Sequence, residues 1–478
     1  MIFSSIVFLG LFLPVTFFSY YLVPVRWRNV LLAIASVVFY AWGEPRYVIL
    51  MIVSVAANFS LAIAIDRATS RRVLLLTAAV ALNLVLLGVF KYGNFVVDNV
   101  DWLLERFGVE RIVLKPIDIP IGISFYTFHA ISYLIDIYRR NVKPNRSIVE
   151  YSLYIMLFPQ LVAGPIIRYK DVHTQLARRA CSIDDVSAGI VRFTMGLSKK
   201  VLIANQLGLV ADTAFNVPGD QLGPAVAWLG LVCYTLQLYF DFSGYSDMAI
   251  GLARMFGFRF PENFDYPYTA TSIQDFWRRW HISLSTWFRD YIYIPLGGNR
   301  RGEGRTLVNL WTVFLLTGLW HGASWNFVIW GAIHGFFLMM ERLTRNGGRL
   351  RLAAVPVFVR RLYAVLVVMF AWVFFRAASL EQALQYLQAL VGHWPKAQWT
   401  VSAEQVCSQQ TGILLVVAAI LAGGFYPWLA RRSDALWRGL ARRALDGWAR
   451  LVLVTPALIL SSMSLALGQY NPFIYFRF

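Results

Sequence analysis

Long apolar stretches alternate with short basic segments along the chain. The first stretch, residues 2–24, is long enough to cross the ~30 Å hydrocarbon core of a bilayer. No Lys or Arg precedes it and no small-residue cleavage pattern follows it, so it predicts a transmembrane helix and not a removable signal peptide. Further membrane segments are predicted at residues 29–42, 46–65, 73–90, 119–138, 151–167, 201–216, 225–250, 307–319, 327–341, 362–376, 411–429 and 451–467.

Several of these segments are shorter than the ~20 residues that a full crossing requires, so we expect tilted, broken or re-entrant pieces and about eleven crossings. Of the 478 residues, 58% are hydrophobic and 15% are charged, whereas soluble domains carry roughly 45–50% and about 25%. The chain is therefore predicted to be an all-α polytopic membrane protein with a single domain over residues 1–478. Its three widely spaced cysteines favour neither a disulfide framework nor a zinc site.

The net charge of +18 is compatible with nucleic-acid binding, but the basic residues lie in clusters between apolar stretches. This is the pattern of cytoplasmic loops that face anionic lipid, and no nucleic-acid partner is predicted. The basic loops are residues 26–28, 67–72, 139–146, 168–200, 254–305, 342–361 and 431–450, and the loops poor in Lys and Arg or balanced by acids are 43–45, 92–118, 217–224 and 377–410. Their alternation predicts an N-terminus outside and a cytoplasmic 254–305 loop.

His321 is the clearest candidate for chemistry. It lies in the apolar stretch 317–324, inside a hairpin of about 36 residues between two basic loops, where two complete crossings need ~40. The turn of the hairpin should therefore lie deep in the membrane or in a recess open to the outer side. An ionisable group at that depth is a functional candidate, and the alternative is a hydrogen bond to a neighbouring helix. The spacings Gly318–Gly322 and Gly331–Gly335 favour close helix packing.

His281 is the second candidate. Residues 272–275 resemble a capping box and predict a helix over 273–291. At 3/4 spacing this helix would carry an apolar stripe of Ile273, Phe276, Trp277, Trp280, His281, Leu284, Phe288 and Tyr291, with arginines elsewhere. An interfacial helix at the membrane surface explains the Trp and Arg content, but it does not explain a histidine on the apolar stripe.

Two carboxylates, Asp241 and Asp247, fall in or near a predicted membrane helix. They indicate either a wet tunnel wall or ion site, or an ion pair with an arginine of the 254–289 region. His129 and His334 are interpreted as packing or hydrogen-bonding residues. The turn 297–302 is interpreted as a tight loop, with phosphate binding as the alternative. No metal-binding spacing occurs among the histidines.

Six further segments have long and specific sequences: Val38–Trp42, Pro120–Phe128, Phe158–Pro165, Phe240–Gly251, Phe276–Trp287 and Leu319–Gly322. They closely resemble the membrane-bound O-acyltransferase (MBOAT) family, and most of all its bacterial alginate O-acetyltransferase branch. The resemblance runs to about residue 342, with its signature-bearing core over about 117–342. It is loose beyond that point, apart from a family-like ending at 470–473.

The resemblance implies a ring of tilted helices around a thinner centre in the bacterial inner membrane. It also implies transfer of an acetyl group from a cytoplasmic thioester, by default acetyl-CoA, toward an exported polysaccharide, with periplasmic acetyltransferase partners and no bound cofactor or metal. His321 falls on the membrane-embedded histidine of the family, and His281 on its second signature position, a His or Asn. We expect the substrate path to be lined by Trp320, Asp241, Trp277 and Trp280.

Chemically, a neutral imidazole can take the proton of an acceptor hydroxyl that attacks a thioester. The acceptor stays open at this stage, since cellulose, teichoic acid, a lipid or a protein would suit the same chemistry as alginate. A transporter or channel that uses the carboxylates and histidines as an ion path is the rival class. The lack of a visible inverted repeat counts against it.

Overall fold

The computed structural model describes residues 1–345, 355–393, 395–396, 399–425, 441–468 and 470–472, and the regular structure in these ranges is helical. The N-terminal helices are α1 (Leu13–Leu22), α2 (Arg28–Gly43), α3 (Val48–Arg67), α4 (Arg72–Leu87), α5 (Gly93–Arg106), α6 (Ile123–Tyr138), α7 (Ile148–Met156), α8 (Phe158–Leu161), α9 (Tyr169–Ala177) and α10 (Ile183–Ser198). The others are α11 (Asn205–Asn216), α12 (Pro224–Met255), α13 (Ile273–Arg279), α14 (Ile282–Phe288), α15 (Glu303–His321), α16 (Trp325–Arg345), α17 (Val357–Arg376), α18 (Leu380–Leu390), α19 (Ala403–Val406), α20 (Gln409–Ala422) and α22 (Ala441–Ala466).

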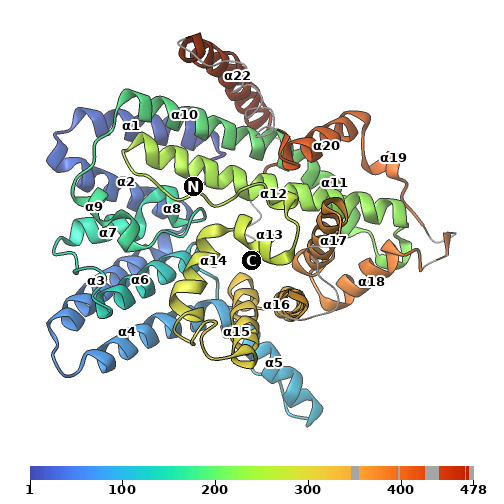
Figure 1. The fold of residues 1–478 in the computed structure, drawn as a ribbon, viewed down its shortest axis with the longest axis horizontal. Helices are drawn as coiled ribbons and strands as arrows, with labels where there is room; N and C mark the ends of the chain where they lie inside the picture. Colours follow the sequence, from blue (N-terminus) through green and yellow to red (C-terminus); the bar gives the residue numbers. More distant parts are fainter. Residues whose placement is uncertain (346–354, 394, 397–398, 426–440, 469, 473–478) are drawn as a thin grey trace.

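Helix α12 joins two groups of helices (Figure 1). In this view α1 to α4 and α6 to α9 lie on the left, α11 and α17 to α20 lie on the right, and α13 to α16 lie between them, with α5 projecting below α15. Helix α10 packs along α12 so closely that their backbones meet at glycine residues. A Cβ added to Gly251 of α12 would lie only 2.6 Å from the backbone nitrogen of Phe193 of α10. Small residues thus let these two backbones approach closely, as in many membrane helix pairs.

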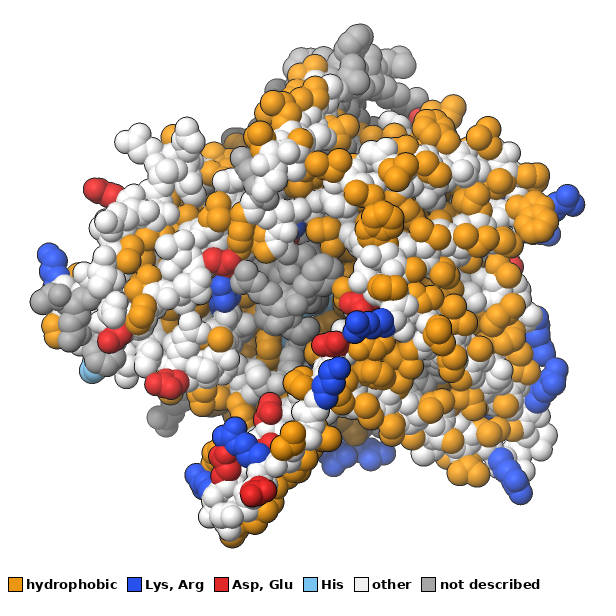
Figure 2. Space-filling view, turned by 180° about the vertical axis from the view of Figure 1, so that it is seen from behind, with side chains coloured by type: hydrophobic (Ala, Val, Ile, Leu, Met, Phe, Trp, Pro, Cys, Tyr) orange, Lys and Arg blue, Asp and Glu red, His pale blue; other side chains and the backbone are white. Residues whose placement is uncertain are grey.

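Four helical stretches of the described residues are long and apolar enough to cross a membrane: Pro45–Arg67, Arg72–Arg106, Pro224–Met255 and Val357–Arg376. Large apolar side chains such as Leu22, Ile49 and Leu74 are exposed on the outer surface of the N-terminal helices. Figure 2 shows hydrophobic side chains over much of that half of the molecule. A water-soluble monomer rarely exposes so much apolar surface, which identifies a multi-pass membrane protein.

Most predicted segments coincide with helices. The segment predicted at 151–167 is broken, since α7 ends at Met156 and α8 covers only Phe158–Leu161. Several helices occupy regions predicted as loops, among them α5, α9, α10, α18 and α19. Parts of the predicted segment 411–429, of the basic loops 342–361 and 431–450, and of the ending 470–473 lie outside the described residues.

The carboxylates of α12 form ion pairs, but the predicted partners were wrong. Asp241 pairs with Lys200 at 2.8 Å, and both side chains are almost fully buried. Asp247 pairs with Lys199 at 2.6 Å and with Arg192 at 2.8 Å. The partners come from α10 and the adjoining π-helical turn Lys199–Ala204, because this stretch packs along α12.

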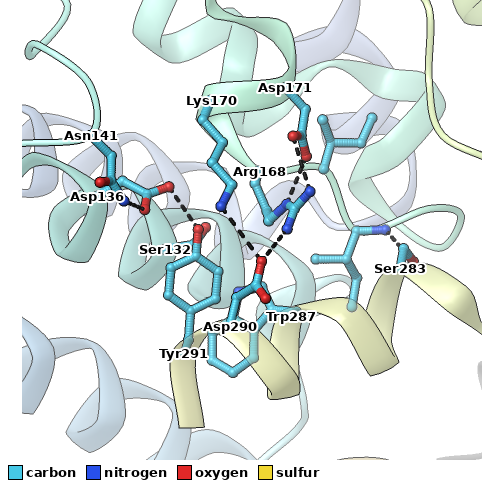
Figure 3. A network of polar contacts seen from close by, with 12 residues as sticks. Ser132, Asp136, Asn141, Arg168, Lys170, Asp171, Ser283, Trp287, Asp290 and Tyr291 are labelled. Atoms are coloured by element: carbon cyan, nitrogen blue, oxygen red, sulfur yellow. Dashed lines mark hydrogen bonds and ion pairs between the residues drawn. The ribbon is translucent and has the colours of Figure 1, made fainter. Parts of the chain in front are cut away.

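A polar network fixes the turn after α14 to α6 and α9 (Figure 3). The hydroxyl of Tyr291 donates to the buried carboxylate of Asp136 at 2.7 Å. Beside it, Asp290 pairs with Arg168 at 2.5 Å and with Arg289 at 2.8 Å. Burial acts to raise the pKa of the Asp290 carboxyl, but these guanidinium groups outweigh burial and lower that pKa. The carboxylate therefore stays ionised at neutral pH and holds this part of the chain in place.

The buried ion pair of Lys200 and Asp241 predicts that replacing Lys200 destabilises the protein more than replacing its neighbour Lys199. Lys200→Met should destabilise the protein by about 3–5 kcal/mol, because it leaves the carboxylate of Asp241 buried without its cation. Lys199→Met is the matched control and should cost less, since Lys199 is 29% exposed and Asp247 keeps Arg192. Thermal unfolding in detergent measures both. The double variant Lys200→Met/Asp241→Leu should recover most of the loss, and equal damage in the single and double variants would contradict the ion-pair role.

Candidate functional site

The hairpin of α15 and α16 places His321 at the last residue of α15. A Cβ on Gly318 would collide with the carbonyl oxygen of Phe327, and one on Gly331 with that of Phe314. These glycines let the two helices pack closely, as their spacing predicts. The hairpin therefore turns directly after His321 and leaves its side chain inside the protein, 6% exposed.

His281 lies at a break between α13 and α14, so the single helix predicted over 273–291 is wrong. The predicted cap at Ser272 is present and accepts from the nitrogen of Asp275, but α13 ends at Arg279. His281 then adopts a left-handed conformation with φ of 46°. The break is stabilised by residues 263–265, since Asn263 O accepts from Ile282 N at 3.0 Å and Asp265 N donates to Arg279 O at 2.9 Å.

The break and the hairpin bring the two candidate histidines together. The ring centres of His281 and His321 are 6.5 Å apart, and both side chains are buried. Trp320 lies 6.0 Å from His281 and 4.9 Å from His321 between ring centres. In the part of the chain that the structure describes, the Nε2 atoms of both histidines are buried and have no hydrogen-bond partner. Such atoms are costly to bury and are candidates for contact with a substrate.

Two cavities lie near this pair; His321 lines the first, and His281 lines neither. The first, of about 800 Å³, is lined by His321, Trp320, Lys91 and segments around residues 43–47 and 116–125. The second, of about 780 Å³, is lined by residues around 271–299 and 338–344. Both touch α15: the second reaches Thr317 and the first reaches Trp320, three residues further on. At 1.5 Å of rise per residue, about one helical turn separates the two cavities along α15.

The two cavities differ in charge. Arginines dominate the charged side chains of the second cavity, which is lined by Arg278, Arg289, Arg342 and Arg360 beside Glu341. Arg278 is exposed and has no ion-pair partner among the described residues. Charges of both signs line the first cavity, namely Glu44, Arg46, Lys91 and Asp118. The second cavity therefore suits an anionic ligand, since guanidinium groups bind phosphate and carboxylate well.

Lys91 is a site residue that the sequence did not reveal. It lies in the π-helical turn Gly88–Tyr92, is 7% exposed, and lines the first cavity with His321. Its ammonium group donates to the carbonyl oxygen of Trp320 and lies 3.4 Å from that of His321. A cation at the C-terminus of a helix interacts favourably with the last carbonyls, so Lys91 holds the end of α15. The sequence signal that could have revealed this residue is its position as a lone lysine inside an apolar stretch.

The remaining predicted residues divide into two groups. Trp320 lines the first cavity and Trp277 lines the second, whereas Trp280 and Asp241 line neither. His334 accepts from Trp277 Nε1 at 3.2 Å, and His129 Nε2 accepts from the backbone of Ile167 at 3.2 Å. The last two histidines thus have the hydrogen-bonding roles expected of them.

No cluster of His, Cys, Asp or Glu suited to a metal occurs among the residues that the structure describes.

A buried histidine pair, of which His321 lines a cavity, in a multi-pass helical protein is suited to a membrane-bound acyltransferase. Comparison with known proteins establishes that class: the model of the membrane-bound O-acyltransferase family, MBOAT, matches residues 117–382, and the chain belongs to this family.

Several relatives are O-acetyltransferases by name. The chain is 42% identical to "Probable alginate O-acetylase AlgI" of Azotobacter vinelandii over 100% of both chains. A protein of the same name from Pseudomonas aeruginosa is 44% identical over 88% of this chain and 81% of its own. The "Peptidoglycan O-acetyltransferase" of Helicobacter pylori is 36% identical over 82% of this chain and 80% of its own.

The contact between Lys91 and α15 predicts a selective loss of activity. Lys91→Met removes the cation that holds the carbonyls of Trp320 and His321. A shift of about 1 Å in His321 can cost about 100-fold in rate. We expect a loss of that order in acyl transfer per mole of folded protein.

Tyr92→Phe is the matched control, because it removes a 2.8 Å bond to the carbonyl of Leu319 on the same helix end but no charge. It should cost much less activity. Equal losses in the two variants would show that the charge of Lys91 contributes no more than the neutral hydrogen bond of Tyr92.

Proposed function

We propose that this protein transfers an acetyl group from a thioester donor in the second cavity to an acceptor hydroxyl in the first, for O-acetylation of an exported polysaccharide. The observation that carries the proposal is the position of His281 and His321, side by side where the two cavities approach each other. The named activities of the alginate and peptidoglycan relatives support an acetyl group and a polysaccharide.

The proposed donor is acetyl-CoA on the cytoplasmic side of the bacterial inner membrane. The 254–305 loop, with its eight arginines, contributes much of the lining of the second cavity. The positive-inside rule favours the cytoplasm for such a loop and the outside for the N-terminus. Acetyl-CoA carries phosphates that guanidinium groups bind well, and Arg278 and Arg289 are placed to receive them.

His321 would act as the general base. The acceptor hydroxyl gives its proton to the imidazole, its oxygen forms a bond to the acetyl carbon, and the carbon–sulfur bond breaks. The proton then passes to the thiolate that leaves. The surrounding rings of Trp320, Trp330 and Phe375 would limit hydrolysis by water.

The acceptor would be reached from the outer side. A periplasmic acetyltransferase partner that receives the acetyl group and passes it to the polymer suits a cavity lined by the 116–125 segment, next to the predicted outer loop 92–118. We also propose that the shorter helices complete about eleven crossings, in a ring that is thin at the histidine pair, because short apolar helices can cross only where the path through the membrane is short.

His321→Ala tests the function. We expect normal membrane yield and a loss of polymer-bound acetate by about 10²–10⁴-fold, because the general base is removed. The assay measures ester-linked acetate on the exported polymer in a strain that carries only the variant. Wild-type acetate levels in His321→Ala would overturn the proposal, whereas loss of yield together with acetate would indicate a structural role.

Asn299→Cys tests the sidedness. Asn299 lines the second cavity, so an impermeant thiol reagent should fail to label this cysteine in intact cells and label it after permeabilisation. Val113→Cys is the matched control, because Val113 is 97% exposed in the predicted outer loop and should be labelled in intact cells. The unsubstituted protein gives the baseline of the native cysteines. Ready labelling at position 299 and none at 113 would invert the orientation and with it the donor side.

A further inference from the structure

The side chain of Asn263 contacts the ring of His281, and the neighbouring hydrogen bonds determine which atom donates in this contact. Its Oδ1 accepts from the backbone nitrogen of Ser283 at 3.2 Å and from the Ser283 hydroxyl at 2.8 Å. Its Nδ2 donates to the hydroxyl of Ser246 on α12 at 3.1 Å. A backbone N–H only donates, so the atom of Asn263 that faces Ser283 must be the oxygen. Nδ1 of His281 lies 3.1 Å from this same oxygen.

This contact fixes the tautomer of His281. A nitrogen that bonds to an oxygen acceptor must carry the hydrogen, so neutral His281 carries its hydrogen on Nδ1. Its Nε2 then has a free lone pair. This atom is buried and has no hydrogen-bond partner among the described residues. Nε2 of His281 can therefore act only as a hydrogen-bond acceptor.

We propose that Asn263 is a positioning residue of a polarised relay that runs from Asn263 through His281 to His321. In this relay His281 Nδ1–H donates to Asn263, His281 Nε2 accepts from His321 Nε2–H, and His321 Nδ1 is the base that meets the acceptor. The two Nε2 atoms lie on rings whose centres are 6.5 Å apart, a separation that a slight closure or one bridging water spans. Because His321 Nε2 is buried, Nδ1 is the nitrogen left to meet the first cavity.

The relay deepens the proposed function and rests on it. When the acceptor O–H loses its proton to His321 Nδ1, the new positive charge is stabilised by the hydrogen bond from His321 Nε2–H to His281. The carbon–oxygen bond forms, the carbon–sulfur bond breaks, and the proton leaves His321 for the thiolate. His281 and Asn263 gain and lose no atoms. Their arrangement resembles the third member of a catalytic triad, which orients its histidine without being protonated.

Few charged groups act on this pair. The titratable neighbours of His321 are His281, Lys91 on the turn before α5, and His334 on α16. Phe242 of α12 packs edge-on against His281 at 4.7 Å between ring centres. No carboxylate is among the groups that act on either ring within the described chain. A carboxylate introduced at position 263 would therefore be the first anion beside His281.

Asn263→Asp provides the test, with activity measured as acetyl transfer in proteoliposomes from pH 5 to 9. Aspartate keeps the acceptor for His281 Nδ1–H and for Ser283, but it favours the imidazolium form of His281, which can no longer accept from His321. We expect activity to fall on the acid side about 1–3 pH units higher than in the wild type, with transfer retained at high pH.

Ser283→Ala is the matched control. It removes a hydrogen bond to the same Asn263 oxygen and one from Ile166 N at 2.9 Å, without adding charge. Its pH profile should parallel that of the wild type, whatever its yield. Coincident profiles for all three proteins would overturn the relay and leave Asn263 a structural residue. Loss of Asn263→Asp activity at every pH would overturn it as well, because the acceptor is retained.

His281→Asn gives an independent check. An asparagine oxygen can still accept from His321 Nε2–H, so this variant should retain more activity than His281→Ala. In the His281→Asn background, Asn263→Asp should no longer shift the pH profile. A shift that persists would show that Asn263 acts elsewhere. If the wild-type protein itself transfers no acetyl group, the proposed function fails, which is a different outcome from unshifted profiles in active proteins.

Discussion

A helix that is interrupted inside apolar protein must find new partners for the backbone groups that the interruption frees. Residues 263–265 provide these partners for α13 and α14, and the same segment holds the ring of His281. Asn263 is tied in turn to Ser246 on α12, so the central helix determines where this histidine lies. The start of α13 is fixed from another direction, because the carboxylate of Glu341 on α16 accepts from the nitrogen of Gln274 at 3.0 Å.

The second histidine is positioned by a different part of the chain. His321 ends α15, whose last carbonyls are held by Lys91 and Tyr92 between α4 and α5. The candidate site therefore forms where the N-terminal helices meet the α13–α16 segment, and neither group provides it alone. Aromatic rings join the two groups of helices around Trp320. The ring of Phe128 on α6 stacks against Trp287 at 3.9 Å and against Trp320 at 5.4 Å between ring centres.

The sequence predicted those features that depend on composition and length. Hydropathy located most helices, and the hairpin predicted between two basic loops is present, with His321 buried at its turn. The break at His281 could not be predicted, because the 3/4 apolar spacing continues through it and the competing bonds come from Asn263, eighteen residues earlier. The prediction of the ion-pair partners was wrong for a similar reason. Proximity in sequence suggested arginines after α12 for Asp241, whereas helix packing supplied Lys200.

The single turn of α15 between the two cavities has an electrical consequence. If the cavities open to opposite sides of the membrane, as proposed, water and ions enter both, and most of the membrane voltage falls across the thin partition near Thr317 and Trp320. A unit charge that crosses the full potential gains or loses about 2.3 kcal/mol per 100 mV. In the proposed reaction the acetyl group passes to the acceptor on the outer side while the acceptor's proton passes to the thiolate on the inner side, so the exchange as a whole moves no net charge across this field. The partition can therefore pass the acyl group without coupling its transfer to the energised state of the membrane.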